Sequence, residues 1–305
     1  MSKHIEISVK TNPLWAEYVS ELLINRVGCY GVVTEEKEFR DEVVVKADVE
    51  RVKGYLPFSS DFNIEDIRHL FAEERKNLIN SGISAENIGC WTVETKEIRE
   101  EDWAHNWKLF WHPQKIGKNI VICPTWEEYA PQQDDVMIYL DPGSAFGTGT
   151  HPTTKLCIEA LEKLIPEFSG EINMADIGTG SGILAITAAK LGVKSVIGVD
   201  NDASVIAVAK ENAEKNGVNS QCTFFAGSAA DVEGKYDIVT ANILAEVLVD
   251  MMPELARLLK PSGILVLSGI INKKLPLIQE SLGKTNLRLK EVLWEDVWIA
   301  TIVSG

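Results

Sequence analysis

Residues 174–200, MADIGTGSGILAITAAKLGVKSVIGVD, decide the fold of this chain. An apolar strand leads into glycines at alternate positions, Gly178, Gly180 and Gly182; a helix follows, and a second apolar strand ends at Asp200. Glycines after a strand allow a tight turn and let the backbone approach a ligand, because they carry no Cβ. An acid at the end of the next strand is placed to accept hydrogen bonds from both hydroxyls of a ribose. The stretch therefore predicts a strand–helix–strand unit that binds a cofactor containing a nucleoside.

The spacing of the glycines separates the classes of cofactor. The dinucleotide fingerprint is G-x-G-x-x-G, and Ile183 occupies the position of its third glycine. No Lys-Ser or Lys-Thr pair follows, which excludes a phosphate-binding P-loop. The run G-T-G-S-G, after a strand that carries Asp176, resembles motif I of class I methyltransferases, which bind S-adenosylmethionine. The alternative is a glycine-rich turn without a ligand, but the glycines and Asp200 occur together in one unit, which argues against it.

Composition indicates a globular protein without a membrane partner. The chain has 305 residues, 45% hydrophobic and 25% charged, and is long enough for two domains. No apolar run approaches the roughly 20 residues that span a bilayer, and the first residues, MSKHIEISVK, lack the apolar core of a secretory signal. The five cysteines are scattered and form no C-x-x-C, so neither a disulfide framework nor a metal site is predicted. We expect a reduced, cytoplasmic protein.

The formal net charge of −15 bears on the partner. It argues against direct nucleic-acid binding, which requires Lys and Arg to neutralise phosphates. It suits a basic partner, because opposite charges steer encounter. Surplus acid that only maintains solubility is an equally open interpretation.

Residues 1–98 predict an N-terminal ferredoxin-like α+β domain. Its pattern predicts strands at 4–10, 31–36, 42–49 and 88–98, with helices at 13–27 and 64–80. The order β-α-β-β-α-β is that of a split βαβ module. No catalytic group is evident in it, so we expect it to bind or present the substrate.

Residues 99–118 predict a linker with a short helix. Trp103, Trp107 and Trp111 are four residues apart and share one face of this helix, which Pro113 ends. Docking on a domain surface is the favoured role for them, and one wall of a substrate cleft is the alternative. His105 and His112 are expected to be surface or capping residues.

Residues 119–305 predict an α/β domain. The expected strands are 119–124, 136–141, one ending at Asp176, 195–200, 222–228, 236–243, 263–269, 289–296 and 297–304, and the expected helices are 152–165, 182–191, 203–216, 245–259 and 273–282. Alternating strands and helices indicate a Rossmann-like, mostly parallel sheet with helices on both faces. The last two strands predict an antiparallel hairpin at the C-terminal edge of the sheet, as in class I methyltransferases.

Ligands of open α/β sheets bind at the carboxyl ends of the strands. The glycine loop and Asp200 fall there, for the methionine and the ribose of the cofactor, and Gly227–Asp231 is a weaker candidate for the adenine side. Asn242, in DIVTANIL, ends a further strand. Methyltransferases of planar nitrogens carry Asn- or Asp-Pro-Pro-Tyr there, whose ring stacks on the substrate. Ile243 and Leu244 provide no ring, so the pattern favours an aliphatic amine over a flipped base.

Methyl transfer to an amine requires alignment more than a dedicated base. A lysine has a reference pKa of about 10.4, and burial beside a positive sulfonium disfavours its charged form. His151 is the nearest candidate for a general base. A histidine before proline in a tight loop is more often structural, and that role is favoured.

Further motifs give the chain a family resemblance. They are DWxxxW at 102–107, WHP at 111–113, ICPTW at 122–126, LDPGSAFGTGTHPTT at 140–154, GSGILAI at 180–186, ENAEKNG at 211–217 and ANIL at 241–244. With them, the chain from about 100 to 305 closely resembles the bacterial methyltransferases of large-subunit ribosomal protein L11. The N-terminal module matches in layout rather than in motif.

The resemblance implies an S-adenosylmethionine-dependent protein-lysine methyltransferase. It implies trimethylation of lysine side chains and of the N-terminal α-amine of L11, a basic protein, with the N-terminal domain gripping the substrate. Carried over by motif, Thr154, Gly178, Asp200 and Asn242 would contact the cofactor, with Gly180 of the same loop, and Asn242 would also be the catalytic residue. The family often has Cys where this chain has Thr179, a mild departure. We expect a monomer.

Three other functions are weighed against this one. A nucleic-acid or glutamine methyltransferase is disfavoured by the missing Pro-Pro-Tyr and the acidic charge. A small-molecule methyltransferase would not need the N-terminal domain. A non-catalytic module that binds the cofactor is disfavoured because both Asp200 and Asn242 are present.

Overall fold

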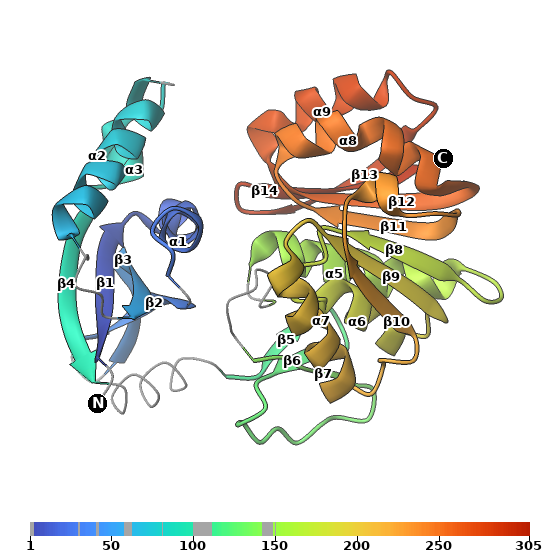
Figure 1. Cartoon of the computed structure of the whole chain (residues 1–305), viewed down its shortest axis with the longest axis horizontal. Helices are drawn as coiled ribbons and strands as arrows, with labels where there is room; N and C mark the ends of the chain where they lie inside the picture. The colour runs from blue at the N-terminus through green and yellow to red at the C-terminus, as the bar shows by residue number, and fades with distance from the viewer. Residues whose placement is uncertain are drawn as a thin grey trace. The chain divides into compact units, whose positions relative to one another are not determined.

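The structure is a computed structural model that describes residues 3–29, 31–40, 43–57, 63–80, 82–99, 112–141, 149 and 151–305. The chain divides into two compact units, Met1–Trp111 and His112–Gly305. Figure 1 shows the elements of each unit. Among the described residues, no helix is both long enough and apolar enough to cross a bilayer.

The first unit has the predicted ferredoxin-like fold. Its elements are β1 (Lys3–Thr11), η1 (Pro13–Trp15), α1 (Ala16–Asn25), β2 (Gly31–Arg40), β3 (Val43–Pro57), α2 (Ile64–Asn80), α3 (Ala85–Ile88) and β4 (Thr92–Arg99). The sheet order is β2-β3-β1-β4, and every neighbouring pair is antiparallel. The alternation in β1 buries Ile5, Ile7 and Val9 against α1, where Val19 and Leu23 are fully buried. These apolar periods are the ones that predicted the first strand and helix.

One boundary in this unit differs from the prediction. The last strand was expected from residue 88, but β4 begins at Thr92. Ser84 instead caps α3, because its hydroxyl accepts a hydrogen bond from the backbone N–H of Asn87. Trp91 then turns inward, and its indole donates to Oγ1 of Thr11 at 2.8 Å. The local cap and this long-range bond outweigh the apolar run that favoured a longer strand.

The second unit has the predicted mostly parallel sheet. Its elements after residue 151 are α5 (Pro152–Leu164), η3 (Ile165–Glu167), β8 (Asn173–Ile177), α6 (Ile183–Lys190), β9 (Ser195–Asp200), α7 (Ala203–Lys215), β10 (Cys222–Ala226), η4 (Ala229–Asp231), β11 (Tyr236–Asn242), α8 (Ala245–Leu258), β12 (Leu259–Ile271), η5 (Asn272–Lys274), α9 (Leu275–Leu282), β13 (Arg288–Glu295) and β14 (Trp298–Ser304). The order is β10-β9-β8-β11-β12-β14-β13, parallel as far as β12 and antiparallel at β14 and β13. This confirms the fold class, including the antiparallel C-terminal edge.

Two apolar layers sandwich this sheet. One contains buried residues of α5, α6 and α7, such as Leu161, Ile186 and Ala209. The other contains Leu248 of α8 and Ile278 of α9. The helices accordingly cover opposite faces, as Figure 1 shows. From β8 the chain proceeds to β9 and β10 on one side and to β11 on the other. The order therefore switches between β8 and β11, which is where such sheets bind ligands.

A small separate sheet precedes the main one. It consists of β5 (Gln114–Ile116), β6 (Ile120–Cys123) and β7 (Val136–Tyr139), with β6 and β7 parallel. Glu162 of α5 fixes its first turn by accepting from the backbone N–H groups of Lys118 and Asn119 at 2.7 and 2.6 Å. Residues 114–116 fall within the predicted linker. The helix predicted in that linker, with Trp103, His105, Trp107 and Trp111, lies outside the described residues.

Candidate active site

The glycine loop and Asp200 come together at the carboxyl ends of β8 and β9. The backbone N–H groups of Gly178 and Thr179 donate to the carbonyl of Val199 at 2.8 and 3.0 Å. The N–H of Gly180 donates to Oδ2 of Asp200 at 3.0 Å. The loop is thus hydrogen-bonded to the end of β9. Asp200, the residue predicted to bind the ribose, also helps to shape the loop.

All three glycines of the loop, Gly180 included, have a positive φ, and two of them also leave too little room for a Cβ. Gly178 and Gly182 have φ of 73° and 81°, in the left-handed region that side chains rarely adopt. A Cβ on Gly178 would lie 2.5 Å from Cγ2 of Ile243, and one on Gly182 would lie 3.1 Å from Cβ of Ala209. The loop therefore packs directly against the residue after Asn242 on one side and against α7 on the other.

Thr154 and Asn242 also meet, although 88 residues separate them in the sequence. Nδ2 of Asn242, at the end of β11, donates to Oγ1 of Thr154, in the first turn of α5, at 3.3 Å. Oδ1 of Asn242 is buried and has no hydrogen-bond partner among the described residues. A buried acceptor without a donor costs about 1–3 kcal/mol. Its presence here points to a donor on a bound ligand.

The five predicted site residues form one continuous region. Gly180 contacts Asp200, Thr154 contacts Asn242, and Ile243 joins the two groups by packing on Gly178. The weaker candidate loop adjoins them, because the N–H of Gly227 donates to the carbonyl of Asp200 at 2.8 Å. In that loop Ser228 and Asp231 form a capping box, which accounts for part of its pattern without a ligand.

Asp176 is a buried acid that sequence patterning placed only as part of the motif. It is 1% exposed and accepts hydrogen bonds from Oγ1 of Thr179 at 2.7 Å and Oγ1 of Thr240 at 2.6 Å. Burial raises its pKa to about 6, although the two hydroxyls oppose the shift. Asp176 thereby ties the glycine loop to β11, the strand that carries Asn242. Thr240 and Asn242 alternate on β11 and so lie on one face of the strand. This alternation is the only sequence signal that points to the contact between Asp176 and Thr240.

His151 has a structural role. It is the N-cap of α5, where its Nδ1 accepts from the backbone N–H of Thr153 at 3.2 Å, and its ring lies edge-on to Trp298 at 5.0 Å. Burial lowers its pKa to about 3, so the ring is neutral near pH 7. His112 is exposed and lies 3.7 Å from Oε1 of Glu127. Both observations agree with the non-catalytic roles favoured for these histidines.

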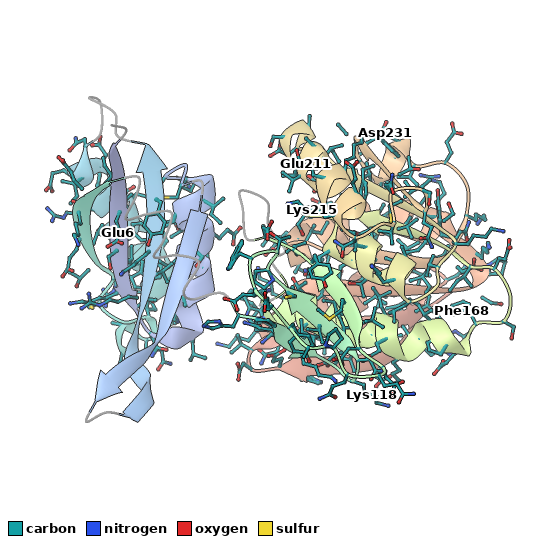
Figure 2. All side chains as sticks on the ribbon, turned by 90° about the horizontal axis from the view of Figure 1, so that it is seen from below. Glu6, Lys118, Phe168, Glu211, Lys215 and Asp231 are labelled. Carbon is teal, nitrogen blue, oxygen red and sulfur yellow. The ribbon has the colours of Figure 1, made fainter. Side chains whose placement is uncertain are left out.

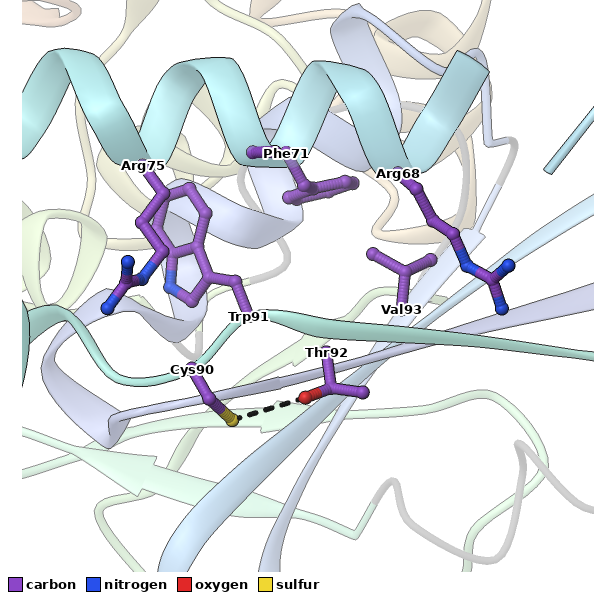
Figure 3. A pocket seen from close by; sticks show the side chains of 8 residues that line it. Arg68, Phe71, Arg75, Cys90, Trp91, Thr92 and Val93 are labelled. Carbon is purple, nitrogen blue, oxygen red and sulfur yellow. Dashed lines mark hydrogen bonds between the residues drawn. The ribbon is translucent and has the colours of Figure 1, made fainter. Parts of the chain in front are cut away.

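A pocket of about 410 Å³ lies in the first unit, between α2 and β4. Arg68 and Arg75 flank it, with Phe71, Trp91 and Val93 between them (Figure 3). Both guanidinium groups are already engaged, Arg68 with Glu65 and Arg75 with the carbonyls of Gly89 and Ala85. None of the residues predicted to bind the cofactor lines this pocket.

Comparisons with known proteins show the family of this chain. The family described as "Ribosomal protein L11 methyltransferase (PrmA)" matches residues 3–304. Proteins named ribosomal protein L11 methyltransferase from Alkaliphilus oremlandii and an Exiguobacterium species are 42% and 40% identical, and each alignment covers 98% of both chains. The crystal structure of ribosomal protein L11 methylase from Lactobacillus delbrueckii subsp. bulgaricus is 38% identical, with a TM-score of 0.59, and covers 64% of this chain and 98% of that one. The chain therefore belongs to the ribosomal protein L11 methyltransferase family.

Proposed function

We propose that this protein methylates amino groups of ribosomal protein L11, at lysine side chains and at the N-terminal α-amine, up to the trimethylated state. As a member of its family it is a methyltransferase with S-adenosylmethionine as cofactor and L11 as substrate. The class of amine and the roles of individual residues are inferred from the geometry of the site.

The site residues fit this cofactor, which supplies an activated methyl group on a sulfonium when it is bound. Each carboxylate oxygen of Asp200 accepts one backbone N–H, from Gly180 or from Asp202. Each oxygen keeps a further lone pair, so the side chain can accept from both hydroxyls of a ribose. The glycine loop presents backbone without Cβ atoms to the amino-acid part. Gly227–Asp231 lies beside Asp200, on the side proposed for the adenine.

Oδ1 of Asn242 is the single observation that carries the catalytic assignment. In the first two transfers this buried acceptor would receive an N–H of the substrate amine and so aim the nitrogen lone pair at the methyl group. A neutral dimethylated amine has no N–H left to donate, so in the third transfer packing of its methyl groups would align it. Nδ2 is bonded to Thr154, which holds the amide plane in one orientation. Ile243 packs on Gly178, and Leu244 is 50% exposed, so the residues after Asn242 offer an aliphatic surface rather than a stacking ring. An aliphatic amine suits such a surface, since it needs an acceptor and a setting that disfavours its charged form.

The organisation of the chain supports a protein substrate. We assign substrate recognition to the ferredoxin-like domain, residues 1–98, a connecting role to residues 99–118, and catalysis to residues 119–305. The net charge of −15 suits a basic substrate, because opposite charges steer encounter. The protein would act in the cytoplasm as a monomer, without direct contact with nucleic acid or membrane.

Intact-mass spectrometry of unmethylated L11 incubated with the protein and S-adenosylmethionine tests the proposal. We expect additions of about 14 Da per methyl group, and peptide fragmentation should place them on lysines and the N-terminus. Asn242→Ala should abolish the additions while the variant still binds S-adenosylhomocysteine, because Asp200 and the glycine loop are intact. Methylation confined to other side chains, or undiminished activity of Asn242→Ala, would refute the assignment.

A further inference from the structure

Two buried amide side chains lie one turn apart at the end of α7, Asn212 within its last turn and Asn216 at its C-cap. They are 3% and 5% exposed, although asparagine in a helix normally faces solvent. Buried polar groups are retained where their hydrogen bonds are satisfied. The partners of these two amides lie on two segments far from α7 in the sequence.

Asn212 holds the glycine loop. Its Nδ2 donates to the backbone carbonyl of Ser181 at 2.9 Å, and Ser181 lies between Gly180 and Gly182. One turn earlier on α7, the fully buried Ala209 packs against Gly182, where a Cβ would come within 3.1 Å. The helix thus contacts the loop at two adjacent points, one apolar and one polar.

Asn216 holds the end of β7. Its Oδ1 accepts from the N–H of Tyr139 at 2.8 Å, and its Nδ2 donates to the carbonyl of Tyr139 at 2.7 Å. The same Nδ2 donates to the carbonyl of Asn212 at 2.8 Å, which links the two amides. Asn216 therefore makes the two hydrogen bonds to Tyr139 that a neighbouring strand would make. Its third hydrogen bond, to the carbonyl of Asn212, fixes the backbone of the residue that holds the glycine loop.

A third contact strengthens this attachment. Lys215 lies 3.1 Å from Oδ2 of Asp141, which directly follows β7 and Leu140. Burial opposes ionisation of Asp141, but hydrogen bonds from Thr125 and Lys215 outweigh it and lower the pKa of the carboxyl. Lys215 and the neighbouring Glu211 are labelled on α7 in Figure 2.

We propose that Asn212 is a positioning residue for the cofactor, through its bond to the carbonyl of Ser181. A segment with three glycines in five residues has high conformational entropy, and an anchor in its middle orders it before the ligand arrives. The anchored loop keeps Gly180 against Asp200 and Gly178 against Ile243. The proposed ribose site at Asp200 and the proposed amine site at Asn242 therefore keep their relative positions. This inference rests on the proposed function, because it requires that the loop binds the cofactor.

The test measures binding of S-adenosylhomocysteine by calorimetry between about pH 5 and about pH 8, for the wild-type protein, Asn212→Leu and Asn212→Asp. We expect Asn212→Leu to weaken binding about tenfold at every pH, the loss of one buried hydrogen bond. Asn212→Asp should be weakened about tenfold at high pH, where a carboxylate faces a carbonyl. It should recover toward wild type at low pH, because the protonated carboxyl can donate to Ser181 and burial raises its pKa.

Asn219→Asp is the matched control, since it makes the same chemical change at an exposed asparagine four residues after Lys215. Its ratio to wild type should be constant over the pH range. In steady-state assays, both Asn212 variants should raise KM for S-adenosylmethionine with little change in kcat. Thermal unfolding at the same pH values shows whether each variant is fully folded; for a fully folded variant, a merely structural role would leave the affinity for S-adenosylhomocysteine unchanged.

Three outcomes are distinguishable. Recovery of Asn212→Asp at low pH, absent in Asn219→Asp, supports the inference even if Asn212→Leu fails to fold. A constant ratio of Asn212→Asp to wild type, or wild-type affinity of Asn212→Leu, overturns it. If the wild-type protein binds no S-adenosylhomocysteine at any pH, the proposed function itself fails.

Discussion

Replacing Asp200 with alanine should remove most of the affinity for the cofactor. In the structure the carboxylate already accepts the N–H of Gly180 at 3.0 Å, and in the proposed complex it also accepts from two ribose hydroxyls. Hydrogen bonds to a charged group contribute about 1.5–3 kcal/mol each. Losing two costs at least about 3 kcal/mol, which corresponds to a factor of about 100 in the dissociation constant. Loosening of Gly180 adds to this loss.

Asp202→Ala is the matched control for this prediction. Asp202 lies two residues away and caps α7, where its Oδ1 accepts from the N–H of Ser204 at 2.8 Å and from its hydroxyl at 2.6 Å. Removing this cap should lower the stability of the protein by about 1 kcal/mol, while the cofactor affinity changes by less than about threefold.

Isothermal titration with S-adenosylmethionine, beside thermal unfolding of each variant, separates the two effects. Asp200→Asn should bind with intermediate affinity, because an amide oxygen still accepts but without charge. Binding by Asp200→Ala within about threefold of wild type would mean that the carboxylate does not contact the cofactor. An equal loss in Asp202→Ala would assign the effect to the helix end rather than to the ribose.

Three further predictions concern the same region. Gly178→Ala should destabilise the protein by about 2 kcal/mol or more and weaken cofactor binding, because its φ is 73° and the new Cβ would lie 2.5 Å from Ile243; unchanged urea unfolding and binding would contradict this. Asp176 has a pKa raised by burial to about 6, so its contribution to stability is present below the unfolded value of 3.8 and is lost as pH rises through about 6. Relative to wild type, Asp176→Asn should therefore gain up to about 3 kcal/mol in unfolding free energy between about pH 4 and about pH 7; a difference independent of pH would refute the assignment. His151 has a pKa lowered to about 3, so its contribution is present above 6.5 and is lost as pH falls. Wild type should lose up to about 1.4 kcal/mol per pH unit below 6.5 relative to His151→Asn, which retains a cap; parallel pH profiles in urea unfolding would exclude a buried neutral ring.

Much of the fold was predictable because its signals are local. The alternation of Ile5, Ile7 and Val9 and the spacing of Val19 and Leu23 each report which face of one element is buried. The boundary at residues 85–91 was missed because the apolar run there competes with a cap at Ser84 and with the long-range bond from Trp91 to Thr11.

The candidate site divides in the same way. Gly178, Gly180 and Asp200 were placed together from sequence, since a strand, a tight turn, a helix and a second strand necessarily bring the ends of the two strands together. Asn242 was predicted from its position at a strand end and from the missing stacking ring. Its contact with Thr154 and the packing of Ile243 on Gly178 became visible only in three dimensions.

The sequence alone determined the class of the sheet, the glycine loop that is predicted to bind the cofactor and the resemblance to one enzyme family. These depend on periodicity and on short motifs, in which each residue acts through its close neighbours. Only the tertiary structure decided which polar residues are buried and what they hold. Asp176 and Thr240 are 64 residues apart, Asn212 and Ser181 are 31 apart, and Asn216 and Tyr139 are 77 apart. An asparagine on a helix has the same local pattern whether it faces water or a loop, and only packing of distant segments removes the water and makes its hydrogen bond specific.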